Sequence, residues 1–346
     1  MPTRELVDQI SIAISIYGEF LKIRHTKIHG GLSISSQLDK LSTGIDIIIA
    51  TPGRLKGFIE DDNINVSSVN IIVLDEADTM LEMGFIKDIE FILSKCSKQR
   101  QIMMFSATIS QNIKKLAKEF LHKPVTIEIS QRRDVVSLIH HLAYKVDLKQ
   151  KHNLLLHLIK KDLTQQILVF VLLRDDANYL TSFLVNNGIS AVTINGHLDY
   201  TQRSKNIKSF KAKKSQVLVA TDIAGRGIDI KDLYLVINFE LPQSTDDFTH
   251  RVGRTGRAGQ KGNVISILTI KDYSTFTKIE RNLKLNIKRI VEDGFELKDR
   301  QPRQKQMKKK SLSIKKGKLN KDSKKQKNKS NRKKITKRDT KRVFRK

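Results

Sequence analysis

Four residues that follow an apolar run could carry out acid–base or metal chemistry. Asp75-Glu76-Ala77-Asp78 comes directly after residues 69–74, which have the length and apolar composition of a buried strand. Acids at the carboxyl end of a parallel strand lie at the edge of the sheet where ligands bind. One carboxylate there can hold Mg²⁺ through its water shell while a neighbour orients or deprotonates an attacking water. An ordinary polar turn has the same composition, so these residues alone leave both interpretations open.

Other polar motifs also follow apolar runs. They are Thr51-Pro52-Gly53-Arg54, Ser106-Ala107-Thr108, Ala220-Thr221-Asp222, Arg226-Gly227-Ile228-Asp229 and the segment from His250 to Arg257. The last segment has three arginines in seven residues, separated by glycines, a composition that disfavours both a helix and a core. It is suited to presenting guanidinium groups to phosphates, and the alternative is a solvated basic loop.

The elements that must position these motifs form two series along the chain. Apolar runs alternate with helical patterns, and the series begins again after the charged connector Gln131-Arg132-Arg133-Asp134. Apolar strands alternating with helices predict a parallel sheet covered on both faces. We therefore expect an α/β protein with domains at residues 1–130 and 138–293, a linker at 131–137 and a tail at 294–346.

Individual elements follow from the same patterns. The expected strands are 45–50, 69–74, 101–105 and 125–129 in the first domain, and 142–146, 167–172, 191–194, 217–220, 235–239 and 264–267 in the second. The expected helices are 85–96, 111–121, 152–160, 176–186, 202–210 and 246–252, with another helical face over Leu6, Ile10, Ile14, Tyr17 and Leu21. Core filling is expected for Cys96, Met80, Met83, Met103 and Met104.

The net charge of +29 is concentrated at one end of the chain. Residues 300–346 contain 23 Lys or Arg and two acids, which gives 23 − 2 = +21, and the rest of the chain carries +8. Such a segment cannot bury enough apolar surface to offset its ordering entropy, so the tail should be disordered. We interpret it as a nonspecific nucleic-acid tether, because unpaired cations bind a phosphate backbone by releasing its counterions; a solubilising tail is the alternative.

The remaining composition indicates a cytoplasmic protein without a membrane segment. Cys96 is the only cysteine, so neither an intramolecular disulfide nor a cysteine-based zinc cluster can form. The residues from Met1 to Leu6 contain no apolar signal core. The longest apolar run, 167–173, is far too short to span a bilayer.

Taken together, the motifs resemble those of bacterial-type DEAD-box RNA helicases, from Pro2 to about Glu292. Pro2–Leu6 resembles the family's motif Ia, Gly30-Gly31 its double-glycine motif, Thr51–Arg54 motif Ib, Asp75–Asp78 motif II, Ser106–Thr108 motif III, Ala220–Asp229 motif V and His250–Arg257 motif VI. The resemblance implies two RecA-like domains in tandem, followed by the basic tail. It also implies ATP and Mg²⁺ as cofactors, RNA as partner with the basic tail as a nonspecific RNA anchor, and a monomer.

The resemblance assigns roles to single residues. Asp75 would hold Mg²⁺ through water, and Glu76 would be the base toward the hydrolytic water. The residues that link nucleotide state to domain closure would be Asp78, Ser106, Thr108 and His250. Arg254 and Arg257 would contact the γ-phosphate. Gly227 and Asp229 would lie near the ribose and the cleft. RNA would contact Thr3, Arg4, Gly31, Thr51, Arg54, Gly196, Arg203 and Thr221, through phosphates and 2′-hydroxyls.

This sequence departs from the family's pattern at its start. It has no aromatic-plus-glutamine adenine motif and no G-x-x-x-x-G-K-[ST] phosphate loop, and Met1 falls where the family has the end of a strand. We therefore expect an incomplete first sheet, with unpaired backbone and an open apolar face. The hypothesis is that Met1 is an internal residue of a longer protein or the start of a truncated gene. The alternative is a genuine short product that binds RNA without hydrolysing ATP.

Smaller departures lie in the second domain. Tyr200 stands where the family usually has Gln, Asn195 where it has His, and Leu172-Leu173 where it has a polar pair. These differences should weaken individual RNA contacts. A DNA helicase of the same superfamily is a third interpretation, disfavoured because the motifs match the RNA branch.

Overall fold

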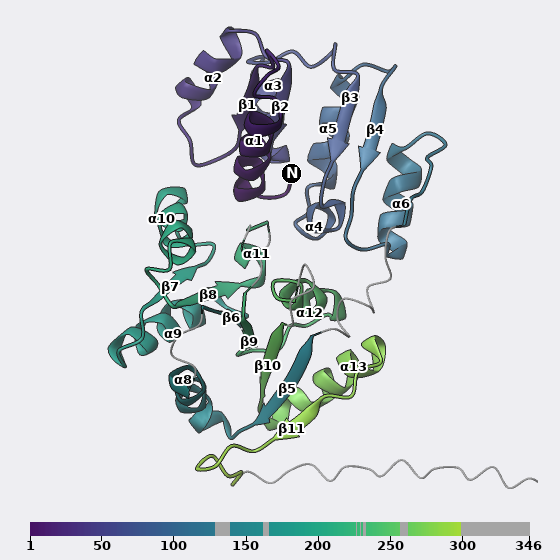
Figure 1. Ribbon diagram of the computed structural model, residues 1–346. Coiled ribbons are helices and arrows are strands. Elements are labelled where there is room, and N and C mark those ends of the chain that lie inside the picture. The colour runs from purple at the N-terminus through teal and green to yellow at the C-terminus, as the bar shows by residue number, and fades with distance from the viewer. Residues whose placement is uncertain are drawn as a thin grey trace, which may run out of the picture. The chain divides into compact units, whose positions relative to one another are not determined.

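The first domain of the computed structural model is built from short strands and helices (Figure 1). The structure describes residues 1–128, 139–161, 166–225, 227–228, 230, 233–256 and 262–298. The elements of the first domain are α1 (Arg4–Tyr17), β1 (His25–Ile28), α2 (Ile34–Ser42), β2 (Ile47–Ala50), α3 (Pro52–Glu60), β3 (Ile71–Leu74), α4 (Ala77–Glu82), α5 (Ile86–Lys95), β4 (Gln101–Met104) and α6 (Gln111–Phe120).

The strands of the first domain form two separate pairs. β1 pairs in parallel with β2, and β3 pairs in parallel with β4, and among the described residues neither pair is joined to the other. On β3, Ile71 is 60% exposed and Val73 is 44% exposed, although both are apolar strand residues. The expected incomplete first sheet is therefore confirmed, with an open apolar face on the strand that leads to Asp75.

The core of the first domain lies between β3 and the helices α4, α5 and α6. Leu74, Met80, Leu93 and Ile113 are buried together in it. The prediction of a strand at 125–129 is wrong for residues 125–128, which the structure describes and which contain no strand. Val125 and Ile127 are 87% and 79% exposed, since no described strand lies beside them to supply hydrogen bonds.

The second domain is a parallel sheet of seven strands (Figure 1). Its elements are β5 (His140–Lys145), η1 (Leu148–Gln150), α8 (Lys151–Lys161), β6 (Ile167–Val171), α9 (Arg174–Asn186), β7 (Ala191–Ile194), α10 (Tyr200–Lys211), β8 (Val217–Thr221), α11 (Asp222–Gly225), β9 (Leu235–Asn238), α12 (Thr245–Val252), β10 (Asn263–Leu268), η2 (Ile270–Asp272), α13 (Tyr273–Leu283) and β11 (Lys288–Ile290). The strand order is β11-β5-β10-β9-β6-β8-β7, with β6 and β8 aligned from Ile167 opposite Val217.

Alternating side chains of the central strands enter two apolar cores, one on each face of the sheet. On β6, Leu168 and Phe170 pack with residues of α10, α12 and α13, while Ile167, Val169 and Val171 pack with residues of α8 and α9. All five side chains are almost fully buried. Burial on both faces explains why the strand sequence is apolar without alternation, as a helix-covered parallel sheet requires.

The described chain continues beyond β11 to residue 298. Phe295 packs against the core on the α8 side, and the backbone N–H of Lys298 donates to Asp147 at 2.7 Å. Glu292 forms ion pairs with Lys161 at 2.8 Å and His157 at 3.1 Å. The expected tail from 294 onward lies largely outside the described residues. In the part of the chain that is described, no helix has the length and apolarity needed to cross a bilayer.

Candidate active site and nucleic-acid pocket

The acidic motif lies where β3 ends and α4 begins. Glu76 occupies the residue before the helix in a left-handed conformation, with φ 50° and ψ 51°. Its backbone N–H donates to the Asp75 carboxylate at 2.9 Å. A left-handed conformation is costly for a residue with a Cβ, and such positions cluster at functional sites. The turn therefore fixes two adjacent carboxylates at the end of a parallel strand, as the sequence predicts.

Burial and neighbouring charges shift the pKa of Glu76 in this motif. Burial raises the pKa of Glu76, the Arg254 guanidinium partly opposes this, and the Asp75 carboxylate adds to it. Asp78 is 4% exposed; its Oδ1 accepts the backbone N–H of Thr79 at 3.0 Å, and its Oδ2 accepts no hydrogen bond among the described residues. A buried carboxylate oxygen without a partner is unfavourable unless a cation or a water satisfies it. The adjacent carboxylates of Asp75 and Glu76 at the strand end fit Mg²⁺, which prefers one or two carboxylates and its own waters.

The Ser106–Thr108 motif forms a turn beside the acids. The Ser106 hydroxyl donates to the Thr108 carbonyl at 2.7 Å and accepts the Thr108 N–H at 3.2 Å. The N–H of Ala77 donates to the Phe105 carbonyl at 3.0 Å, which joins the start of α4 to the end of β4. The structure therefore brings the Asp75–Asp78 motif and the Ser106–Thr108 motif together.

Two residues of the second domain approach the acids. The His250 Nε2 lies 3.9 Å from the Asp78 Oδ2, which is an ion-pair separation and too long for a hydrogen bond. Arg254 donates to the carbonyl of Ile228 at 2.7 Å, and its charge acts on Glu76. Arg257 and Asp229, which the sequence analysis places on the phosphate and near the ribose, lie outside the described residues.

Arg251, the first arginine of the basic motif, faces the core and not a phosphate site. It is 2% exposed and forms a bidentate pair with Asp222 at 2.5 and 2.7 Å. It also donates to the Asn238 side chain at 3.0 Å and the Glu240 carbonyl at 2.5 Å, and its guanidinium lies 4.9 Å from the Phe170 ring centroid. The expectation that this motif makes a poor helix and a poor core is wrong for Arg251, because α12 includes it and four partners satisfy its guanidinium.

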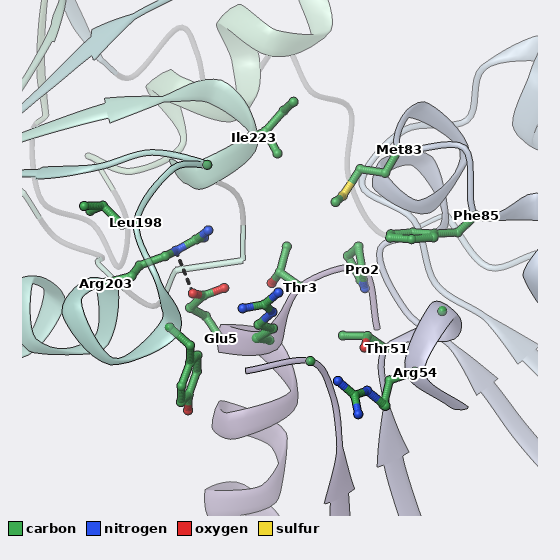
Figure 2. Close-up of a pocket in the computed structure, with 15 residues that line it drawn as sticks. Pro2, Thr3, Glu5, Thr51, Arg54, Met83, Phe85, Leu198, Arg203 and Ile223 are labelled. Atoms are coloured by element: carbon green, nitrogen blue, oxygen red, sulfur yellow. Dashed lines mark ion pairs between the residues drawn. The ribbon is translucent and has the colours of Figure 1, made fainter. Parts of the chain in front are cut away.

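A pocket of about 410 Å³ contains most of the predicted RNA contacts (Figure 2). Six of the eight line it: Thr3, Arg4, Thr51, Arg54, Gly196 and Arg203. Gly30 lines it, while Gly31, at φ 92°, packs so tightly that a Cβ would lie 2.6 Å from the Cβ of Tyr200. Thr221 is buried at the end of β8 and does not line the pocket.

Apolar side chains in the pocket wall were not predicted from the sequence. Met83, Phe85, Leu198 and Ile223 line it (Figure 2), so the expectation that Met83 fills the core is wrong. Met83 follows α4 and is only partly buried, unlike Met80 one turn earlier. The helical spacing of the methionines did not distinguish a core side chain from one at the end of a helix.

Arg203 is held by an acid of the first domain. Its Nε lies 2.7 Å from the Glu5 carboxylate (Figure 2), and its Nη2 donates to the Ala224 carbonyl at 3.0 Å. Burial lowers the pKa of Arg203, and the Glu5 charge opposes this. Gln9, also on α1, donates to the Gly227 carbonyl at 2.8 Å. Gly227, expected near the ribose and the cleft, has φ 68°, and a Cβ there would lie 2.1 Å from the Thr3 hydroxyl.

Tyr200, which replaces the family's usual Gln, has a defined partner. Its hydroxyl donates to the Asp8 carboxylate, which Lys27 also contacts at 2.6 Å and the His29 Nε2 at 3.6 Å. Burial raises the pKa of Asp8, but hydrogen bonds from His29, Lys27 and Tyr200 outweigh it and hold the pKa below its usual range. Glu5, which lines the pocket, and Asp8, which holds the pocket residue Tyr200, were not predicted from the sequence, and the unusual Tyr200 was the available signal.

Two parallel α/β domains, with acids at a strand end of one and arginines in the other, define the tandem RecA-like class of helicase. Residues 1–116 match the family model described as DEAD/DEAH box helicase, and residues 150–259 match that described as helicase conserved C-terminal domain. SrmB of Haemophilus influenzae, an ATP-dependent RNA helicase, is 35% identical over 304 residues, which are 87% of this chain and 69% of that protein. The chain belongs to the DEAD-box helicase family.

Other relatives and solved structures agree with this assignment. DEAD-box ATP-dependent RNA helicase 5 of Arabidopsis thaliana is 40% identical over 75% of this chain and 50% of that protein. S. cerevisiae Dbp5 bound to RNA and ADP BeF3 superposes with a TM-score of 0.76 at 27% identity, covering 84% of this chain and 76% of that one. Mss116 bound to ssRNA and UDP-BeF gives a TM-score of 0.75 at 25% identity, covering 84% and 63%. The chain spans about half the length of several curated relatives.

Proposed function

We propose that this chain carries the RNA-stimulated ATP-hydrolysing and duplex-opening machinery of an RNA helicase. The observation that carries the proposal is the convergence of Asp75, Glu76 and Asp78, from one domain, with His250 and Arg254 from the other. Such a divided site can hydrolyse a phosphoanhydride only when both domains contribute. A monomeric state and a cytoplasmic location belong to the same proposal.

The residues have separate tasks in this proposal. Asp75 would hold Mg²⁺ through water, and that ion would neutralise charge on the phosphates. Glu76, whose burial favours proton uptake, would accept the proton of the attacking water. Arg254 would stabilise negative charge that develops on the γ-phosphate. Asp78, Ser106, Thr108 and His250 would couple the occupied site to domain closure.

RNA would occupy the 410 Å³ pocket. Thr3, Arg4, Thr51, Arg54 and Gly196 offer hydroxyls, guanidinium groups and close backbone approach, all suited to phosphates and 2′-hydroxyls. Binding should therefore depend little on base sequence. The solved structures of Dbp5 bound to RNA and of Mss116 bound to ssRNA support this partner by likeness of fold. A closed pocket that holds only a bent strand would open a short duplex locally.

A second function is favoured by one specific observation. The strands of the first domain are in two separate pairs, and β3 presents an exposed apolar face next to the acids. On this ground the alternative is an RNA-binding protein that does not hydrolyse ATP.

RNA binding and RNA-stimulated phosphate release by the same preparation distinguish the two functions. Hydrolysis that rises with added RNA, together with strand separation of a short duplex, would support the helicase. Saturable RNA binding with no phosphate release would support the non-hydrolysing alternative. A chain that binds no RNA would contradict both.

The basic tail should control the salt dependence of RNA binding. Deleting residues 300–346 removes a net charge of +21. If about six of those cations contact phosphates, the slope of log affinity against log salt becomes less steep by about 4, since each contact to a single strand contributes about 0.7. Between about 50 and 200 mM salt, the intact chain would then lose about 300-fold more affinity than the deletion variant.

A full-length variant with the tail Lys and Arg replaced by Gln is the matched control for chain length. It should behave as the deletion does. An unchanged slope in both variants would show that the tail does not anchor RNA.

A further inference from the structure

Helix α10 carries a row of lysines that leads away from the pocket. Tyr200 and Arg203, in its first turn, line the pocket. Lys205 and Lys208 follow on the exposed side of the helix, and Lys213 and Lys214 follow directly after it. From Tyr200 to Lys211 the helix is about 17 Å long, which matches about five stacked nucleotides of one strand. We call Lys205, Lys208, Lys213 and Lys214 the α10 lysines.

No acid balances the α10 lysines. The segment from Tyr200 to Gln216 contains one Arg and five Lys but no Asp or Glu. Asp199, just before the helix, accepts the backbone N–H of Gln202 at 2.7 Å as its cap. The strand on which α10 packs, β7, has only uncharged residues. Among the described residues, the ammonium groups of the four α10 lysines form no ion pair.

This arrangement is unfavourable for the folded chain alone. Lys205 and Lys208 are three residues apart and lie side by side on the helix, so their charges repel. Ile207 and Phe210 point to the core and fix which face remains exposed. A polyanion on that face would relieve the repulsion, and a phosphate backbone carries a series of anions that can pair with several neighbouring cations.

We infer that the α10 lysines bind the backbone of the RNA strand as it leaves the pocket. The inference rests on the proposed RNA binding in the pocket, and it extends the footprint from Tyr200 and Arg203, at the start of α10, to the exposed lysines beyond them. Ammonium groups contact phosphates as point charges, so this surface would favour long strands over short ones without reading bases. An acidic protein segment is the competing occupant.

Amine acylation of the full-length chain, with and without RNA, tests the footprint directly. The probes are a uridine tract of about 6 nucleotides, enough for the pocket, and one of about 20, since single-strand sites span about 4–16 nucleotides. The long strand should protect the α10 lysines, and the short one should not. Lys114, Lys115, Lys118 and Lys123 are the internal control, because they are exposed on and after α6 and also form no ion pair among the described residues.

Substitution provides the second test. Changing the four α10 lysines to Gln keeps helix propensity nearly unchanged, and the same change at the four α6 lysines is the matched control. Lys213 and Lys123 both have positive φ, 57° and 46°, so the two sets are alike in backbone strain as well. If three α10 lysines contact phosphates, the slope of log affinity against log salt for the long strand becomes less steep by about 2 in the α10 variant. The ratio of the affinity of the unsubstituted chain to that of the variant then drops about 20-fold between about 50 and 200 mM salt.

The outcomes separate this inference from the proposed function. The inference alone is overturned if both strands still bind, the α10 lysines are not protected, and the slope of log affinity against log salt is the same for the two variants. Protection by a polyglutamate chain but not by RNA also overturns it, in favour of an acidic protein partner. Failure of the unsubstituted chain to bind either strand contradicts the proposed function and the inference together.

Discussion

Replacing Glu76 by Gln should reduce RNA-stimulated ATP hydrolysis by about 10²- to 10⁴-fold, the range that a positioned general base contributes. Gln has the same shape but cannot accept a proton, so the left-handed turn and the contact with Asp75 can persist. RNA affinity should be unchanged, since Glu76 does not line the 410 Å³ pocket in which we propose that RNA binds. Phosphate release and RNA binding, measured on the same preparation, check the two halves of the prediction.

The pH profile gives this prediction a second readout. Burial raises the pKa of Glu76, so its basic form is lost at a higher pH than that of an ordinary carboxylate as the solution is acidified. Hydrolysis by the unsubstituted chain should fall through that pH range, and the residual rate of Glu76→Gln should not. Glu90→Gln, at an exposed position on α5, is the control and should leave hydrolysis unaltered. Loss of RNA binding by Glu76→Gln would show that its role is to position the pocket.

The central strands of the second domain could be predicted because burial on both faces makes them largely apolar. All six expected strands are present, within two residues of their expected ends. The sequence did not reveal β1, His25–Ile28, or β11, Lys288–Ile290, because both contain cations and lie at a sheet edge. The apolar pattern at 125–129 predicted a strand that the described residues do not form. Strand composition is insufficient when no neighbouring strand supplies hydrogen bonds.

The candidate site was predictable where a motif is local and less so where it depends on long-range contacts. Asp75 and Glu76 could be located from one strand and the turn after it. The Glu5–Arg203 and Asp8–Tyr200 contacts join residues about two hundred positions apart, and periodicity does not detect them. Met83 was misplaced for a related reason, since the end of α4 and not its hydrophobic spacing decides which side chain reaches the pocket.

The basic motif shows how one helix can serve both stability and chemistry. On α12, His250 lies 3.9 Å from Asp78 while the next residue, Arg251, enters the core. Arg251 joins the end of β8 through Asp222 to the end of β9 through Asn238 and Glu240. Since Arg254 follows within one turn, the core contacts of Arg251 fix the direction in which His250 and Arg254 project. A guanidinium buried in the core therefore holds the helix that carries the two side chains that we propose to act in the site.

Replacing Arg251 by Ala should destabilise the second domain by about 3 kcal/mol, the lower end of the range for breaking a buried ion pair. The lower end applies because the Asp222 side chain is 23% exposed and can be partly rehydrated, whereas Asn238 is fully buried and loses its donor. The midpoint of thermal unfolding should fall by about 6–12 °C for a domain of this size. Arg281→Ala, at an exposed position on α13, is the control and should leave the midpoint nearly unchanged. Equal midpoints for the two variants would show that the Arg251 contacts contribute no net stability, and the positioning argument for α12 would then fail with them.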